Sequence, residues 1–97
     1  MNERQLRQIL EAIQKAVLDQ TYVMTPHAVF EMCVDKLDVV DVESAILTGT
    51  IERVFENDPR GTRFEVLGKA TDLTTEVGVV VRFAGPLLII TVYEVHA

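Results

Sequence analysis

The spacing of apolar residues changes once along this chain, near Thr50, and that change limits the folds open to it. Before Thr50, apolar residues recur every three or four positions, which is typical of amphipathic helices. After it, they recur at close to every second position, which is typical of half-buried strands. Helices followed by strands predict an α+β fold, with N-terminal helices packed on one face of a four-stranded, mainly antiparallel sheet.

Three helices are predicted in the first half, over about residues 1–20, 26–35 and 38–49. The first has apolar residues at helical spacing, namely Leu6, Ile9, Leu10, Ile13 and Val17. The second begins at Thr25-Pro26, because threonine caps a helix with its hydroxyl and proline suits the first helical position. The β-prone stretch 21–24 between them is either an edge strand or an extended connector.

Four strands are predicted over residues 50–57, 62–70, 76–84 and 87–95. In the second of these, alternation places Phe64 and Val66 on one face and Arg63, Glu65 and Leu67 on the other. The last strand is apolar on both faces for most of its length, so we expect it to be central or covered.

The length of 97 residues predicts a single domain, 1–97. No apolar run approaches the ~20 residues of a membrane span, and the N-terminus is polar, unlike a signal peptide. The only cysteine, Cys33, has no partner for an internal disulfide and is best interpreted as a buried structural thiol. We therefore expect a reduced, cytoplasmic protein that does not enter a membrane.

The charge is uneven, since the acidic segment 31–58 holds eight acids against Lys36 and Arg53 and so carries the whole net charge of −6. It is either a solvated face that aids solubility or a docking surface for a basic partner. Broad binding to a nucleic-acid backbone is not favoured, because that requires clustered Lys and Arg.

His27 and Tyr93 are the first candidates for chemistry. Histidine carries protons easily near neutral pH, and tyrosine can donate or hold one. His27 is either a general acid or base or a partly buried ring that bonds nearby backbone. We expect the two side chains to face one cleft.

Basic residues on the predicted sheet are the second set of candidates, namely Arg63, Lys69 and Arg82. They either form ordinary cross-strand pairs with Glu65 or Glu76, or bind phosphate. No glycine-rich phosphate loop and no paired-cysteine or His-x-x-x-His spacing is present, so we expect no cofactor and no metal.

Several short motifs occur in a fixed order over about residues 22–95. They are His27, Met32, Val42-Glu43, Gly49, Ile51-Glu52, Arg63-Phe64-Glu65-Val66-Leu67-Gly68, Val79-Val80-Val81 and Ile89-Ile90-Thr91-Val92-Tyr93-Glu94. In this order the chain resembles a bacterial domain of unknown function, DUF4258, whose members look like relatives of the RelE and BrnT toxins.

The resemblance implies a RelE/BrnT-like fold and a toxin subunit of a toxin–antitoxin module that cleaves RNA without a metal. His27 would be the acid or base, Arg63 the phosphate contact and Tyr93 a proton donor or orienting group, with Lys69 and Arg82 also binding substrate. A basic antitoxin segment would dock on the acidic segment 31–58.

Two positions depart from the family pattern. Glu31 and Asp35 stand where the family has arginine, and two carboxylates near His27 would repel a phosphodiester. The alternative is therefore a non-catalytic module of the same fold that binds a protein partner or forms a homodimer.

Overall fold

The computed structural model describes residues 1–96. In chain order the elements are α1 (Glu3–Leu18), β1 (Tyr22–Met24), α2 (Pro26–Val34), α3 (Val39–Thr48), β2 (Thr50–Phe55), β3 (Arg63–Lys69), β4 (Glu76–Phe83) and β5 (Leu87–Glu94). The predicted α+β class is confirmed, and the helices precede the sheet's main strands as the change in apolar spacing indicates. None of the described helices is both long and apolar enough to span a bilayer.

The sheet has five strands in the order β1-β5-β4-β3-β2, so the prediction of four was wrong by one. The four strands after Thr50 form an antiparallel meander. The fifth is β1, which pairs in parallel with the start of β5, Tyr22 opposite Leu87. The stretch 21–24 is thus an edge strand and not a connector. Three residues are too few to show a strand periodicity, and their partner lies more than 60 residues away.

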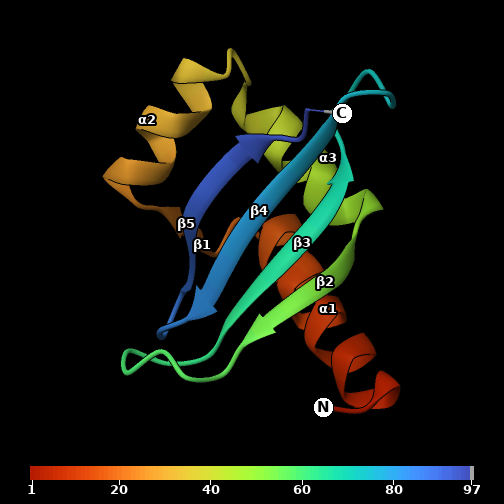
Figure 1. The fold of residues 1–97 in the computed structure, drawn as a ribbon, viewed down its shortest axis with the longest axis vertical. Coiled ribbons are helices and arrows are strands. Elements are labelled where there is room, and N and C mark those ends of the chain that lie inside the picture. Colours follow the sequence, from red (N-terminus) through yellow and green to blue (C-terminus); the bar gives the residue numbers. More distant parts are fainter. Residues whose placement is uncertain (97) are drawn as a thin grey trace.

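All three helices leave the same face of the sheet uncovered (Figure 1). On the other face, α3 packs against β3 and β4, α2 packs along β5, and α1 packs against α3 and β2. The core lies between these layers and includes Ile13, Ile46, Val66, Val79 and Val92, all 0% exposed. We call the uncovered side the open face; functional side chains of the sheet are free to gather there.

Local signals fix where the helices begin. Asn2 and Gln5 exchange backbone-to-side-chain hydrogen bonds in a capping box at the start of α1. The Thr25 hydroxyl accepts a hydrogen bond from the backbone N–H of Ala28, and Pro26 follows as the first residue of α2, as the sequence predicts.

Gly68 sets how closely α3 lies on the sheet. A Cβ atom at this position would be 1.9 Å from the backbone oxygen of Ala45 in α3. Only glycine permits this approach. The close packing holds β3 and its alternating side chains in place between the helices and the open face.

The predicted burial of the last strand is confirmed in part. β5 lies between β1 and β4, so it is an internal strand, and its inward residues Leu87, Ile89 and Val92 are buried. Its outward residues, including Tyr93, are only half-buried because no helix covers the open face.

Candidate functional site

Alternation along β3 divides its side chains between the core and the open face, as predicted. Phe64 and Val66 are buried in the core. Glu65 points to the other face, where it is nevertheless only 5% exposed. A carboxylate so well buried requires hydrogen-bonding partners.

Glu65 receives those partners from two other strands. Arg53, on β2, donates from Nε to Oε1 at 2.8 Å and from Nη2 to Oε2 at 3.0 Å. The Tyr93 hydroxyl, on β5, donates to Oε2 at 2.8 Å. The bidentate arginine and the tyrosine together hold a charged, hydrogen-bonded network in the middle of the open face.

Tyr93 reaches Glu65 only because residue 78 is glycine. Gly78 on β4 lies directly opposite Tyr93, and a Cβ there would be 2.1 Å from Cζ of the tyrosine ring. The ring therefore lies flat over the bare backbone of β4 and places its hydroxyl above β3. Glycine in a strand interior often marks such a close approach.

The network keeps Glu65 ionised and Tyr93 protonated at neutral pH. The hydrogen bonds from Arg53 hold the pKa of Glu65 below its usual value, against the effect of burial, and Tyr93 adds to the lowering. Burial raises the pKa of Tyr93, and its bond to Glu65 raises it further. At neutral pH the site therefore offers a guanidinium and a phenol as donors beside a charged carboxylate.

Three arginines surround one carboxylate next to this network; we call Arg60, Arg63, Arg82 and Asp58 the arginine end. Arg63 on β3 lies directly opposite Arg82 on β4. Nε of Arg63 is 2.9 Å from Oδ2 of Asp58, and Nε of Arg60 is 3.8 Å from Oδ1. The Arg60 backbone N–H and then the arginines lower the pKa of Asp58.

The ring of Phe55 lies beside this group. The guanidinium carbons of Arg53 and Arg63 are 5.4 Å and 5.2 Å from its centroid, within cation–π range. An open depression of about 500 Å³ adjoins it, lined by residues 54–60 and Arg63. Arg60, Arg63 and Asp58 of the arginine end thus line an accessible hollow at one end of the open face, together with Glu56.

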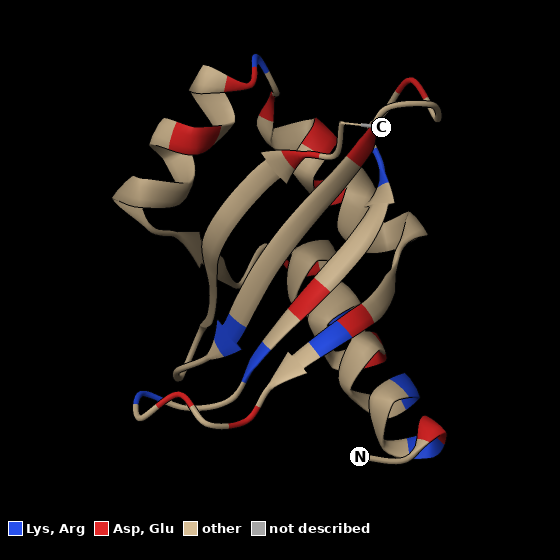
Figure 2. Ribbon diagram, viewed as in Figure 1, with Lys and Arg blue, Asp and Glu red and all other residues tan. Residues whose placement is uncertain are grey.

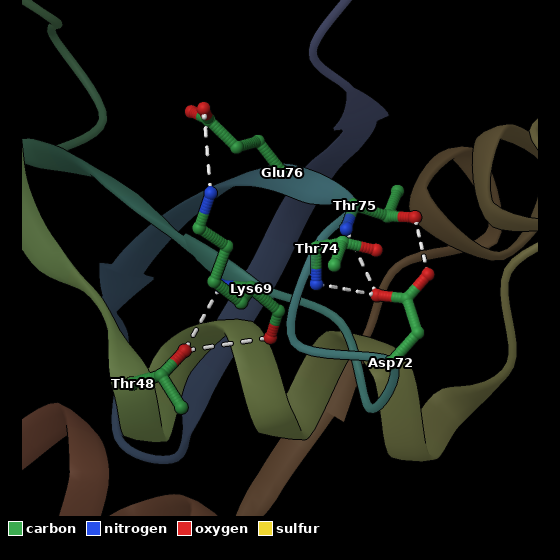
Figure 3. A network of polar contacts seen from close by, with 6 residues as sticks. All are labelled: Thr48, Lys69, Asp72, Thr74, Thr75 and Glu76. Atoms are coloured by element: carbon green, nitrogen blue, oxygen red, sulfur yellow. Dashed lines mark hydrogen bonds and ion pairs between the residues drawn. The ribbon is translucent and has the colours of Figure 1, made fainter.

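Lys69 is not part of this group. It ends β3, six residues from Arg63, which is ~20 Å along a strand. Its ammonium is 3.5 Å from Glu76, its cross-strand neighbour, while its backbone bonds Thr48 (Figure 3). The sequence left two interpretations of Lys69, a cross-strand ion pair or a phosphate contact, and the geometry matches the ion pair.

The same close-up shows a tight turn before β4, in which the Asp72 carboxylate accepts from the backbone of Thr74 and Thr75 and from the Thr75 hydroxyl (Figure 3). These bonds lower the pKa of Asp72 to about 2. Asp72 is a structural carboxylate in a loop without arginines, which makes it a useful counterpart to Asp58.

His27 lies elsewhere, in the first turn of α2. Its side chain is 65% exposed, and Nε2 is 3.3 Å from Oε1 of Glu31. The same Glu31 oxygen accepts the backbone N–H of Val92 at 3.1 Å, on the edge of β5 that faces α2. The hydroxyl of Tyr93 points the other way, over β3, so the structure does not bring His27 and Tyr93 together.

Glu31 and Asp35 both bind backbone. Where β1 ends, α2 runs on beside β5, and Asp35 Oδ2 accepts the N–H of Glu94 at 2.8 Å. The two carboxylates, one helical turn apart, stand in for the carbonyls of a neighbouring strand. They satisfy donors that the short β1 leaves free.

The acids of segment 31–58 do not form one surface. Acidic residues gather along α2 and the start of α3 at one end of the molecule, whereas the basic residues on β2, at the start of β3 and at the end of β4 lie toward the other (Figure 2). The basic residue that ends β3, Lys69, lies away from them. We call Glu31, Asp35, Asp38 and Asp41 the acidic end. Asp58, from the same segment, lies among the arginines.

Sequence reasoning singled out Arg63, Arg82 and Tyr93, and it named Glu65 as a cross-strand partner for a basic residue, but it missed Arg53 and Gly78. The parity of β3, which puts Glu65 on the face of Arg63, was the available signal. The predicted burial of Cys33 is wrong, because this side chain is exposed. Within residues 1–96, no group of three His, Cys, Asp or Glu residues is placed to hold a metal ion.

Comparison with family models matched residues 24–94 to one described as "Domain of unknown function (DUF4258)", which covers most of the chain and leaves α1 outside. Searches of curated proteins and of solved structures found no match.

Proposed function

The chain belongs to the DUF4258 family, and on that premise we propose that it is a RelE/BrnT-like toxin subunit of a bacterial toxin–antitoxin module that binds and cleaves RNA on the open face. The observation that carries the proposal is the pair Arg63 and Arg82, opposed on neighbouring strands beside the Arg53–Glu65–Tyr93 network. Like charges opposite each other in a sheet are unfavourable unless an anion joins them.

The chemistry would be transfer within the RNA strand. A general base takes the proton of the 2′-hydroxyl, whose oxygen attacks the adjacent phosphorus. The bond from phosphorus to the 5′-oxygen breaks, and a general acid protonates the leaving oxygen. Arg63 and Arg82 would bind the phosphate oxygens in pairs and stabilise the charge that builds on them. Tyr93 holds its proton at neutral pH and so would act as donor or orienting group.

Of the residues in the proposed mechanism, His27 has the least structural support. Its ring lies beyond the outer edge of β5, paired with Glu31, and the Tyr93 hydroxyl lies over β3. A bound RNA strand would have to cross β5 to meet both. The proposal therefore rests on the arginines and Tyr93, and His27 is retained as the acid or base to be tested.

The acidic end would receive the antitoxin. The outward side of α2 exposes an apolar stripe, with Phe30 67%, Val34 60% and Val29 40% exposed. Glu31 and Asp35 flank this stripe, so its electrostatic complement is a segment that combines apolar and basic residues. Such a segment would dock on the acidic end. The arginine end would then stay exposed, unless the antitoxin also extends over it.

The test is induced expression in a bacterial host, following growth and total RNA. We expect wild-type protein to arrest growth and cleave RNA, and Arg82→Gln and Tyr93→Phe to lose both effects. Lys69→Gln is the matched control, because it removes a cation from the same open face at the far end of β3 and should remain toxic.

The result for His27→Ala separates two mechanisms. Loss of cleavage, with binding kept, would make His27 the acid or base. Full activity would confine the site to the open face. Normal growth and intact RNA with folded wild-type protein would contradict the ribonuclease proposal.

A second function is favoured by a specific observation. The carboxylates of Glu31 and Asp35, where the resemblance implies arginines, bind the backbone of β5, and the α2 stripe beside them is exposed. Under this alternative the chain is a non-catalytic module that binds a protein partner or a second copy through α2. It predicts complex formation that Phe30→Glu abolishes and Arg82→Gln does not change.

A further inference from the structure

The arginine end holds more positive charge than its own acid neutralises. Arg60 and Arg63 are ion-paired with Asp58, whose side chain is 9% exposed, and Arg82 acts on it electrostatically. Glu56 is the other acid that lines the adjoining hollow. Arg63 and Arg82 are direct cross-strand neighbours, an arrangement that costs free energy without a counter-ion. Asp58 is that counter-ion for Arg63 and, more distantly, for the other two.

Asp58 does not satisfy all the donors. Nε of Arg63 and Nε of Arg82 are both buried, and neither has a hydrogen-bond partner within residues 1–96, although Nε of Arg63 is 2.9 Å from Oδ2 of Asp58. A guanidinium has five N–H donors, and a buried donor without an acceptor is unfavourable. The site is therefore short of both negative charge and acceptor atoms, and a larger anion would supply both.

We propose that the Asp58 carboxylate occupies a phosphate-binding position and is displaced when a phosphate group binds to Arg63 and Arg82. The recognised group is the same in inorganic phosphate and in an RNA strand, and only the RNA case rests on the function proposed above. Asp58 thereby lowers the affinity of the empty site and makes binding depend on movement of the loop between β2 and β3.

Phosphate is the anion that fits these arginines. It carries more charge than a carboxylate and offers enough oxygens to accept from both guanidiniums in pairs. Asp58 is able to leave because it lies in the loop between Phe55 and Arg63, so its departure unpairs no strand. Its remaining side-chain bond is from the backbone N–H of Arg60, 2.8 Å away.

The experiment measures binding of inorganic phosphate by NMR titration of the full chain at constant ionic strength. Asp58→Asn keeps the acceptor for Arg60 and removes the charge, and we expect it to bind phosphate about tenfold more tightly than wild type. Adding Arg82→Gln to Asp58→Asn should abolish the gain. A labelled single-stranded RNA, followed by fluorescence anisotropy, is the second probe.

Asp72→Asn is the matched control. It removes a carboxylate that makes similar loop bonds but lies among threonines, so its phosphate affinity should equal that of wild type. Asp58→Ser, whose hydroxyl also accepts from a backbone N–H two residues on, guards against misfolding of the asparagine variant. It should show the same gain.

The outcomes separate this inference from the ribonuclease proposal. Phosphate affinity that Arg82→Gln lowers but Asp58→Asn and Asp58→Ser leave unchanged would overturn the displacement and leave the arginine site standing. No phosphate binding in any variant would overturn the inference. Tighter phosphate and RNA binding by Asp58→Asn without RNA cleavage would support the inference and count against the nuclease.

Discussion

At the acidic end, the carboxylates of Glu31 and Asp35 accept hydrogen bonds from the backbone of β5, whereas at the arginine end Arg63 and Arg82 oppose each other around one carboxylate. At the acidic end, the charged side chains accept hydrogen bonds from backbone that has no other partner in the sheet. At the arginine end, the positive charge is only partly neutralised. Local excess charge is therefore the stronger sign of a binding site for a small ion where the structure gives that charge no structural role.

The double substitution Glu31→Ala with Asp35→Ala should have the largest effect on this comparison. It leaves the N–H groups of Val92 and Glu94 on the edge of β5 without acceptors, and we expect a loss of about 3 kcal/mol in the free energy of unfolding. Urea denaturation at neutral pH, followed by circular dichroism, measures it.

The isosteric pair Glu31→Gln with Asp35→Asn is the control. Its amide oxygens still accept from the backbone, so we expect it to lose about 1 kcal/mol or less. If the alanine pair were as stable as this control, the carboxylates would have no structural role and the contrast between the two ends would fail.

Gly78→Val should have the next largest effect, on the network between the two ends. The new side chain would displace the ring of Tyr93 and break its bond to Glu65, at a cost of about 2 kcal/mol. Tyr93→Phe should cost about 1 kcal/mol, because it loses the bond and keeps the ring. Equal stability of Gly78→Val and wild type would mean that the ring does not lie over β4.

The sequence predicted the local parts of this molecule. The change of spacing at Thr50, the Thr25-Pro26 helix start and the two faces of β3 depend on neighbouring residues, and all three are confirmed. It left β1 open between an edge strand and a connector, because three residues carry no periodicity and the parallel partner Leu87–Ile89 is distant.

The candidate site was only half predictable for the same reason. Tyr93 and Arg63 were singled out by residue type, but their partners depend on strand register, which places Gly78 under the tyrosine and Arg82 beside Arg63. Glu31 and Asp35 were interpreted as lost site charges. Their bonds to Val92 and Glu94 span about 60 residues and leave no trace in local sequence.

Alkaline unfolding tests the structural role of another carboxylate in the acidic segment. Burial, with help from the bond to Glu43, raises the pKa of Tyr22 to about 12. Below pH 10 the phenol is neutral in both states; between pH 10 and 12 only the unfolded state loses its proton, so stability falls as pH rises. Because Tyr22 is partly exposed, we expect a loss of about 1 kcal/mol.

Tyr22→Phe is the comparison for that measurement, with urea midpoints taken at steps from pH 9 to pH 12. The variant lacks the titrating group, so the part of the decline due to Tyr22 should disappear. If the stability of both proteins fell equally with rising pH, the folded state would not raise the pKa of Tyr22 through burial and its bond to Glu43.

The smallest effect on stability is expected for Arg82→Gln. Removing one of two opposed cations relieves repulsion with Arg63 and loses only the weak attraction to Asp58, so the free energy of unfolding should change by about 0.5 kcal/mol or less. The same urea measurement applies, paired with phosphate titration, in which this variant should bind least. A loss of 2 kcal/mol or more would mean that Arg82 holds the fold together, as Glu31 and Asp35 do, and the arginine end would no longer differ in kind from the acidic end. If the variant is as stable as wild type but no longer binds phosphate, Arg82 is required for binding and not for stability, as expected of a residue in a binding site.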